Sequence, residues 1–548
     1  MNRKKFLGIV LLVTMGVVSA QAVNVNYWWS GDGTNPGGTG TWDTTTAHFG
    51  TASGGPFPII WNNTTHASDF ANFGGSVGLV TLQLGGINVR RIILHTSGYT
   101  LQGGKVTSDA PANTFVIDKP AINAGTINND FDLTLSGANV KVRIRNQGTV
   151  TVPLTLGGNF KFTDATGTKR LDLEGTGSAG SRIDFTGGLL DTPGASVRLR
   201  IGQVANNASV YNLSGNSTYA GGTEVVRGTV NISSATAVST GNVQLATSST
   251  AGGDTVRVFL IGGVNLSNPF STASAFGNAA VTAVLGKDVG DATTSIISGN
   301  INLNSDITRL ELRVANANAQ MKLTGLVTDG AGTRGFTKTG AGVLDLARPG
   351  GNTYDGLTVV NAGTLLVNNI SGSATGTGNV QLGSGATLGG DGSVGGTVIT
   401  MGPTSVLSPG NSVGDLTLGA ANFANGATLK FELGASTTPG VTYDQLVINE
   451  TLIGSTAAGG LKLEITDAGG LQLGIPYTLI TFANATGLDY SDLDPVMLPA
   501  ALDPSFGTGG FLITGTELQV QFLIPEPGSF VLVVCGMLPL LLLGRRGH

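Results

Sequence analysis

Carboxylate side chains are the residues of this chain best suited to chemistry, because a pair of them can cleave a glycosidic bond. Such a pair must be held about 5–9.5 Å apart. The densest acidic patch is Asn128-Asn129-Asp130-Phe131-Asp132. Asn and Asp are also typical of turns, where their side chains bond to the backbone. We interpret the patch as a turn, and no Asp-Asp or Gly-His-Gly cluster elsewhere indicates a polysaccharide-cleaving site.

Metal and thiol chemistry has little support in the sequence. The four histidines are His48, His66, His95 and His548. None has a second metal-type ligand at a recognised spacing, so no metal site and no cofactor are expected. The single cysteine, Cys535, lies inside an apolar run near the C-terminus. We therefore expect no catalytic residues.

The C-terminal residues predict processing. Pro525-Glu526-Pro527 precedes an apolar run of 14 residues, 530–543, and Arg545-Arg546 follows the run. As a helix the run would reach about 21 Å, whereas the hydrocarbon core of a bilayer is about 30 Å thick. We expect a short hydrophobic helix that acts as a processing signal. A short tail anchor is the alternative.

This order of motif, apolar run and basic end resembles the PEP-CTERM sorting signal of Gram-negative bacteria. The resemblance covers residues 524–548 only. It implies that exosortase, a membrane-embedded transpeptidase-like protease, recognises Pro525, Glu526 and Pro527 and removes the tail that contains Arg545 and Arg546. It also implies transient anchoring in the inner membrane before cleavage, in a host that makes exosortase.

The N-terminal residues predict export. A basic stretch at 3–5 precedes an apolar stretch at 6–18, which would form the signal helix. Ala20 and Ala22 supply the small residues that signal peptidase requires, so we expect cleavage after Ala22. The net charge of −5 gives no electrostatic case for a nucleic acid partner. We expect the processed chain at the cell surface or in the extracellular matrix.

The composition favours many short strands joined by tight turns. Glycine accounts for 86 of 548 residues, and charged residues make up 11% of the chain, compared with about 25% in ordinary soluble proteins. The apolar share of 40% argues against disorder. Apolar and polar residues alternate at 139–145, 149–152 and 196–201, as in strands with one apolar face. Loss of Cys535 with the tail would leave an exported chain without disulfides.

One unit of sequence recurs. Its segments are 217–223, 227–230 and 241–245 in the first copy, and 352–358, 362–365 and 378–382 in the second. Tyr219 and Tyr354 are 135 positions apart, whereas the Gly-Asn-Val-Gln-Leu segments that close the two copies are 137 apart. The second copy therefore has a two-residue insertion, which we expect in a turn.

These segments resemble the autotransporter-associated β-strand repeat. The second copy contains the whole pattern of that repeat, beginning at Lys338, and the first lacks the Lys-led opening. The resemblance implies an all-β, right-handed parallel β-helix. Stacked coils bury a core that one coil cannot bury alone. At about 20–25 residues per coil, a common solenoid repeat length, the chain would form roughly 20 coils.

The chain is expected to divide into five parts. They are a signal peptide at 1–22, an N-terminal β-helix region at 23–200, a β-helix with autotransporter-associated repeats at 201–420, terminal coils or a β-sandwich-like cap at 421–523, and the sorting signal at 524–548. The N-terminal region begins with Tyr27, Trp28, Trp29 and Trp42. These aromatic residues are expected to cap the first coil, with a ligand platform as the alternative.

Three functions fit these features to different degrees. The first is an exported, non-enzymatic β-solenoid that serves as an adhesin, a scaffold or a partner of extracellular polysaccharide. The second is a β-helix polysaccharide lyase or glycoside hydrolase with an unusual site. The third is an autotransporter, which requires a C-terminal transmembrane β-barrel. Because the chain closes on an apolar run and Arg545-Arg546, we expect the repeat without that translocator.

Overall fold

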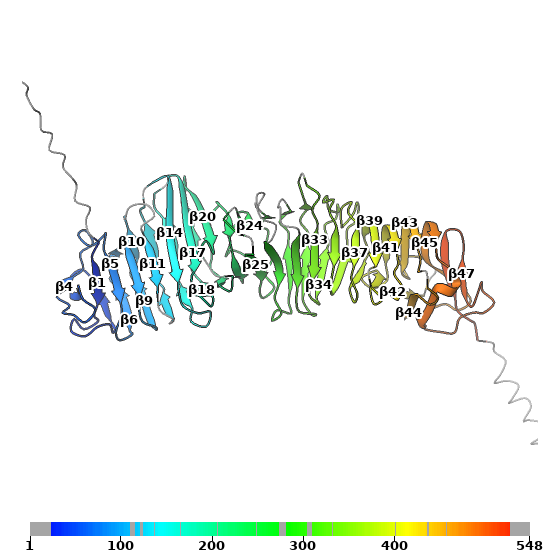
Figure 1. Cartoon of the computed structure of the whole chain (residues 1–548), viewed down its shortest axis with the longest axis horizontal. Helices are drawn as coiled ribbons and strands as arrows, with labels where there is room; N and C mark the ends of the chain where they lie inside the picture. Colours follow the sequence, from blue (N-terminus) through cyan, green and yellow to red (C-terminus); the bar gives the residue numbers. More distant parts are fainter. Residues whose placement is uncertain are drawn as a thin grey trace, which may run out of the picture.

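The computed structural model describes residues 24–525, apart from 110–114, 121–123, 136, 165, 205–206, 248, 252, 273–280, 304–308, 331, 401, 436–437 and 456. The described chain is an elongated rod of short strands, with the first strands at one end and the last at the other (Figure 1). Its helical content is the 3-10 helix η1 (Tyr490–Asp492). No helix within these residues has the length and apolarity needed to cross a membrane. The expected signal helix and C-terminal hydrophobic helix lie outside the described residues.

The strands form four sheets, which we call sheets I to IV. Sheet I contains, in order, β32 (Val327–Thr328), β29 (Ile301–Asn302), β26 (Phe270–Thr272), β24 (Val243–Leu245), β22 (Thr223–Val225), β20 (Ser196–Ile201), β17 (Thr168–Gly175), β14 (Asn139–Asn146), β11 (Val116–Lys119), β8 (Arg91–Leu94), β5 (Phe70–Phe73), β1 (Asn26–Trp29), β3 (Ala47–Gly50) and β4 (Ile59–Ile60).

Sheet II runs through the whole rod. Its strands, which pair in succession, are β2 (Gly40–Trp42), β6 (Leu79–Leu82), β9 (Tyr99–Gly103), β12 (Gly125–Ile127), β15 (Leu154–Leu156), β18 (Arg182–Phe185), β21 (Val210–Leu213), β23 (Gly228–Ile232), β25 (Thr255–Leu260), β27 (Thr282–Lys287), β30 (Leu310–Val314), β33 (Phe336–Thr339), β35 (Thr358–Val360), β37 (Val380–Leu382), β39 (Ser393–Thr400), β41 (Asp415–Asn422), β43 (Gln445–Ile453), β45 (Pro476–Thr486), β48 (Glu517–Gln521) and β47 (Phe511–Ile513).

Two shorter sheets complete the coils. Sheet III contains β7 (Ile87–Asn88), β10 (Val106–Ser108), β13 (Phe131–Leu133), β16 (Phe160–Phe162) and β19 (Leu189–Leu190). Sheet IV contains β28 (Thr294–Ile297), β31 (Gln320–Leu323), β34 (Val343–Leu346), β36 (Thr364–Val367), β38 (Thr387–Gly390), β40 (Val406–Pro409), β42 (Ala427–Gly434), β44 (Leu461–Gly469) and β46 (Leu493–Met497).

From β5 to β47, consecutive strands lie in different sheets, and the chain returns to the same sheet after one coil. For example, β8, β9 and β10 lie in sheets I, II and III, and β11 then pairs in parallel with β8. The chain is therefore all-β and forms a parallel β-solenoid. Coil length varies more than the expected 20–25 residues: Val380 pairs with Val398, 18 positions on, and Leu446 pairs with Ile480, 34 positions on.

The cross-section of the solenoid changes along the rod. Sheet III ends at β19, sheet IV begins at β28, and sheet I ends at β32. Beyond β32 the coils have strands in sheets II and IV only, and turns cover the third side. The strands from β41 to β46 continue the parallel pairing. The segment from 421 onward thus begins as further coils.

The core consists of inward-facing side chains that stack from coil to coil. On sheet III, Val106, Phe131, Phe160 and Leu189 occupy matching positions and are fully buried. The rings of Phe131 and Phe160 stack with centroids 4.2 Å apart. Parallel in-register pairing places equivalent side chains directly above one another, so each coil buries the inner face of the next.

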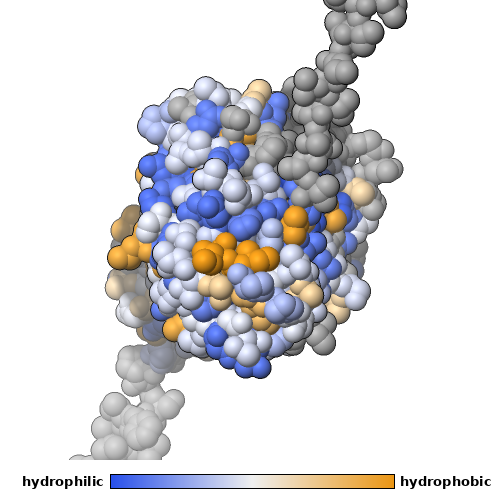
Figure 2. Space-filling model, turned by 90° about the vertical axis from the view of Figure 1, so that its left-hand side faces the viewer, coloured by the Kyte–Doolittle hydropathy of each residue, from blue (hydrophilic) through white to orange (hydrophobic). Residues whose placement is uncertain are grey.

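Antiparallel strands close both ends of the rod. At the N-terminus β1 pairs with β3 and β3 with β4, and the rings of Trp29, Trp42, Phe49 and Trp61 pack together beneath them. Trp29 and Trp42 are buried in this packing, whereas Tyr27 and Trp28 are half-buried. Figure 2 looks at this end of the rod and shows a mainly polar surface with a small apolar patch. At the C-terminus β48 pairs with β45 and with β47.

Two local expectations need correction. Residues 149–152, expected as a strand, form a turn in which the N–H of Val152 donates to the carbonyl of Thr149 over 3.3 Å. Four residues are the shortest run of alternation that predicts a strand, and here the run lies in the connection between β14 and β15. Within the acidic patch, Phe131 and Asp132 belong to strand β13, so only the preceding residues form the turn.

Candidate ligand-binding face

Strands β14, β17 and β20 present a charged face to solvent. Alternation on β14 turns Val140, Val142 and Ile144 into the core, and the residues between them therefore point outward. The outward residues of the three strands and of β22 are Asn139, Lys141, Arg143, Arg145, Thr168, Arg170, Asp172, Glu174, Ser196, Arg198, Arg200 and Glu224. Six of these are cations and three are anions, a surplus of three positive charges in a chain whose net charge is −5.

Parallel register arranges these residues in columns that run along the rod. Lys141 pairs with Arg170, and Arg170 pairs with Arg198, so three cations follow one another on adjacent strands. We call these three residues the cation column. Neighbouring strands are about 4.8 Å apart, and like charges directly opposite each other destabilise a sheet.

The next column of this face alternates in sign. Arg143, Asp172, Arg200 and Glu224 occupy matching positions. Arg200 lies 3.3 Å from Glu224 in an ion pair. Burial lowers the pKa of Arg200, and the charge of Glu224 opposes that shift. This column shows the arrangement that favours stability, with opposite charges across each strand pair.

Arg145 and Glu174 occupy matching positions on β14 and β17 and form a further column. Glu174 is almost fully buried and accepts a hydrogen bond from Arg145 Nε over 3.1 Å. Burial raises the pKa of Glu174, although the neighbouring guanidinium groups act in the opposite direction. These contacts make Glu174 part of the packing of the sheet.

A fourth column lies on the other side of the cation column and is uncharged. It consists of Asn139, Thr168 and Ser196 in register. Amide and hydroxyl groups both donate and accept hydrogen bonds. This neutral column and the cation column together place neutral hydrogen-bonding groups next to a row of cations.

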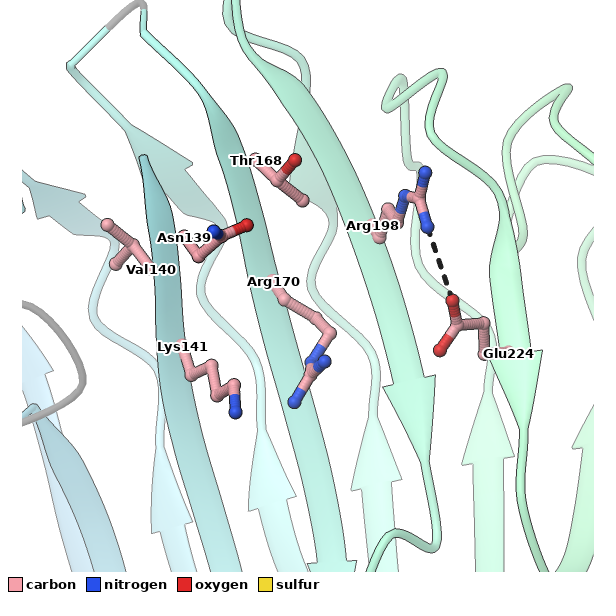
Figure 3. Close-up of a pocket in the computed structure, with 7 residues that line it drawn as sticks. All are labelled: Asn139, Val140, Lys141, Thr168, Arg170, Arg198 and Glu224. Atoms are coloured by element: carbon pink, nitrogen blue, oxygen red, sulfur yellow. Dashed lines mark hydrogen bonds and ion pairs between the residues drawn. The ribbon is translucent and has the colours of Figure 1, made fainter. Parts of the chain in front are cut away.

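The cation column lines an open groove of about 450 Å³ (Figure 3). Its lining consists of Asn139, Val140, Lys141, Thr168, Arg170, Arg198 and Glu224. Arg170 donates to Asp172 from Nε over 2.5 Å and from Nη2 over 2.9 Å. Arg198 reaches Glu224 over 3.4 Å. The groove thus holds three cations and one carboxylate, and it lacks the second carboxylate that sugar hydrolysis requires.

A second groove, of about 230 Å³, lies on sheet IV. Its lining consists of Thr364, Leu366, Thr387, Gly389, Ser408, Pro409, Gly410, Asn411, Ser412 and Glu432. Asn411 bridges coils by donating to Asn368 over 2.8 Å and to Asp391 over 3.1 Å. Glu432 is the one carboxylate in this lining. The groove is polar but does not supply a carboxylate pair either.

Asp329 and Asp355 form a carboxylate pair that the sequence did not predict. Asp329 and Asp355 are 26 positions apart, and the N–H of Asp355 donates to Asp329 over 3.0 Å. Their side chains are also hydrogen-bonded, which raises the pKa of Asp355. Burial would raise the pKa of Asp329, but backbone N–H groups of Arg334 and Asp355 outweigh it and lower that pKa. Two carboxyl groups that are hydrogen-bonded to each other leave no room for a sugar between them. Only the coil register brings them together.

The acidic patch has structural contacts. Asp130 accepts a hydrogen bond from the N–H of Asn159 over 2.8 Å, and Asp132 forms an ion pair with Lys105 over 2.5 Å. Both contacts join neighbouring coils, Asp130 from the connection before β13 and Asp132 from β13 itself.

The described histidines, His48, His66 and His95, lie in the N-terminal coils, and His548 lies outside the described residues. His48 Nδ1 lies 2.8 Å from the carbonyl of Ser30, and His95 stacks on Trp28 with centroids 4.7 Å apart. Burial lowers the pKa values of His66 and His95. Among the described residues, no group of three or more metal-binding side chains comes together.

Most of the residues expected to direct processing lie outside the described residues. Pro525 is exposed and is the last described residue. Glu526, Pro527, Arg545 and Arg546 lie outside the described residues, as do Ala20 and Ala22. The expected processing sites therefore remain predictions from the sequence.

Comparison with known families finds the repeat. The family described as Passenger-associated-transport-repeat matches residues 208–232 and 336–367. The first match spans β21 to β23, and the second spans β33 to β36. Tyr219 and Thr223 hydroxyls lie 2.5 Å apart in one, and those of Tyr354 and Thr358 lie 2.8 Å apart in the other. The chain therefore carries the autotransporter-associated repeats that the sequence predicted.

Comparison with individual proteins finds a partial relative. The chain is 28% identical over 219 residues to "Adhesin BmaC autotransporter" of Brucella suis biovar 1 (strain 1330). The match covers 39% of this chain and 5% of that protein. The chain is thus similar, over part of its length, to an autotransporter adhesin, a likeness that suggests an exported or cell-surface protein.

Proposed function

We propose that this protein is an exported, non-enzymatic rod that acts at the cell surface or in the extracellular matrix as an adhesin or polysaccharide-associated scaffold. In this proposal the solenoid is right-handed, and the sorting signal at 524–548 directs the chain through the inner membrane to exosortase. The solenoid itself is the observation that carries the proposal. Its strands pair from β2 to β45 without interruption and include both matched repeats.

The geometry of the rod supports a scaffold more than an enzyme. The groove on β14, β17 and β20 and the groove on sheet IV each contain one carboxylate, and the hydrogen-bonded pair Asp329 and Asp355 is too close to enclose a sugar. The charged face extends across several coils, as expected of a surface that contacts an extended partner. The partial likeness to an adhesin is consistent with this interpretation.

The mass of the intact protein from its native cells tests export and sorting. A product that begins after Ala22 and ends near Pro525 is expected, with the tail retained in a Glu526→Ala variant. Ser529→Ala, a change in the same segment outside the motif, should be processed like the unmodified chain. A full tail in all three proteins would contradict sorting by exosortase and favour a short anchor.

Incubation of the purified protein with a panel of polysaccharides tests the non-enzymatic assignment. We expect no new reducing ends and no unsaturated products with any substrate. Catalytic turnover that is lost in Asp130→Asn/Asp132→Asn or in Asp355→Asn would contradict the proposal.

A further inference from the structure

We propose that the cation column and the neutral column beside it bind an acidic polysaccharide chain, which lies across the strands and parallel to the axis of the rod. The site consists of Lys141, Arg170 and Arg198 with Asn139, Thr168 and Ser196. This inference rests on the proposed function, because it names the class of ligand that the extracellular rod would hold.

The arrangement of charge is the first argument. A column of three cations in register is unfavourable for the sheet, and the adjacent column of Arg143, Asp172 and Arg200 shows that this fold accommodates alternating signs. Arg170 is paired with Asp172, whereas the pairing of Arg198 is incomplete. Arg198 Nε makes no hydrogen bond among the described residues, and Glu224 is shared between Arg198 and Arg200. A row of external anions would remove the remaining repulsion.

The geometry of the groove is the second argument. The strands set a step of about 4.8 Å between successive cations. A polyuronate carries an acid group on every sugar, so a chain that lies along the column can bring more than one carboxylate to the three cations. Arginine is well suited to this contact because its planar guanidinium can pair with a carboxylate through two hydrogen bonds. The neutral column then faces the sugar hydroxyls.

The composition of the groove distinguishes among polyanions. Single-stranded nucleic acids are held by basic grooves in which bases stack on aromatic side chains. The lining of this groove contains no aromatic ring. Rows of amide and hydroxyl groups suit a ligand that carries many hydroxyls on each unit. An acidic polysaccharide therefore fits this surface better than a nucleic acid does.

The test is a binding measurement by titration calorimetry with polygalacturonate on the full processed chain. We expect a Kd that weakens steeply with salt, as for binding that releases counterions. The variant Lys141→Gln/Arg170→Gln/Arg198→Gln should bind at least 10-fold more weakly and with a shallower salt dependence. Asn139→Ala/Thr168→Val should bind about 3-fold more weakly with the salt dependence unchanged.

A charge-matched control separates this site from general attraction. Lys161→Gln/Lys322→Gln/Lys430→Gln removes the same charge elsewhere and should bind like the unmodified chain. Circular dichroism and the melting temperature identify a variant that fails to fold, and the Asn139→Ala/Thr168→Val variant then provides the test. Equal losses in control and site variants, binding of dextran as tight as that of polygalacturonate, or tighter binding of single-stranded DNA would each overturn the proposal. Because binding is measured on purified protein, its failure is distinguishable from a failure of sorting.

Discussion

Buried lysines lie at or next to the terminal residues of strands. The four that are essentially inaccessible to solvent are Lys119, Lys169, Lys287 and Lys338. Lys338, the first residue of the repeat pattern, donates to the carbonyls of Thr339, Gly340 and Ala362 over 2.7–3.0 Å. Ala362 belongs to the next coil, so this lysine ties two coils together. Burial lowers the pKa of Lys338 to about 8.

This shift predicts a pH-dependent contribution to stability. Because the folded pKa is depressed below the ordinary value of 10.5, the unfolded chain binds more protons between pH 8 and 10.5, and stability should rise with pH in that window. Lys338→Met removes the titrating group. The unfolding free energy of the parent minus that of the variant should therefore rise by about 2 kcal/mol from pH 7.5 to 10.

Urea unfolding at the two pH values measures this difference. Lys430→Met, a change at an exposed lysine, serves as the control and should show no such growth. A Lys338→Met difference that stays constant with pH would contradict the assigned role of burial.

At the scale of the elements, close stacking makes some turn glycines indispensable. Gly340 follows β33 with φ +79°, and a Cβ built there would lie 2.3 Å from the carbonyl oxygen of Val314 in the preceding coil. Gly262 has a similar φ of +71°, but a Cβ there would meet nothing within 4 Å. The two positions thus share the backbone requirement and differ in the space that the neighbouring coil leaves.

Alanine substitutions at these two glycines separate the cost of the left-handed backbone from the cost of contact with the neighbouring coil. Gly262→Ala should lower the free energy of unfolding by about 1 kcal/mol through the left-handed backbone alone. Gly340→Ala should cost about 3 kcal/mol or more, because the coils must also move apart. Chemical denaturation of both variants provides the measurement, and equal costs would contradict the role given to the neighbouring coil.

At the scale of the whole molecule, the caps protect the ends of the sheets. β48 covers the last strand of the parallel ladder, β45, by antiparallel pairing. An uncovered strand edge is a template for pairing with another chain. Deletion of residues 511–525 should therefore increase association relative to the full chain, measured by light scattering after size-exclusion chromatography.

A second deletion variant controls for loss of folding. Adding Thr478→Lys and Thr481→Lys to the truncated chain places charges on β45. These charges should reduce association because they disfavour pairing of the exposed strand with another chain. Equal association of the two truncated chains would show that the exposed edge is not the cause.

Local sequence determined much of this structure. Alternation predicted strands at 139–145 and 196–201, and the structure has β14 (Asn139–Asn146) and β20 (Ser196–Ile201) there. The aromatic residues near the N-terminus predicted a cap, and the recurring Tyr and Thr predicted a repeated unit. These features depend on side-chain alternation and on contacts between residues close in sequence, which a pattern of residue types can reveal.

Tertiary stacking decided which residues became neighbours. Lys141, Arg170 and Arg198 are separated by 29 and 28 positions, and Asp329 and Asp355 by 26, while residues paired in parallel on neighbouring coils lie 18 to 44 positions apart. The same repeat unit lies on sheets I and II in its first copy and on sheets II and IV in its second. Because turns differ in length from coil to coil, counting along the sequence cannot fix the register. The charged face therefore appears only when the coils are stacked.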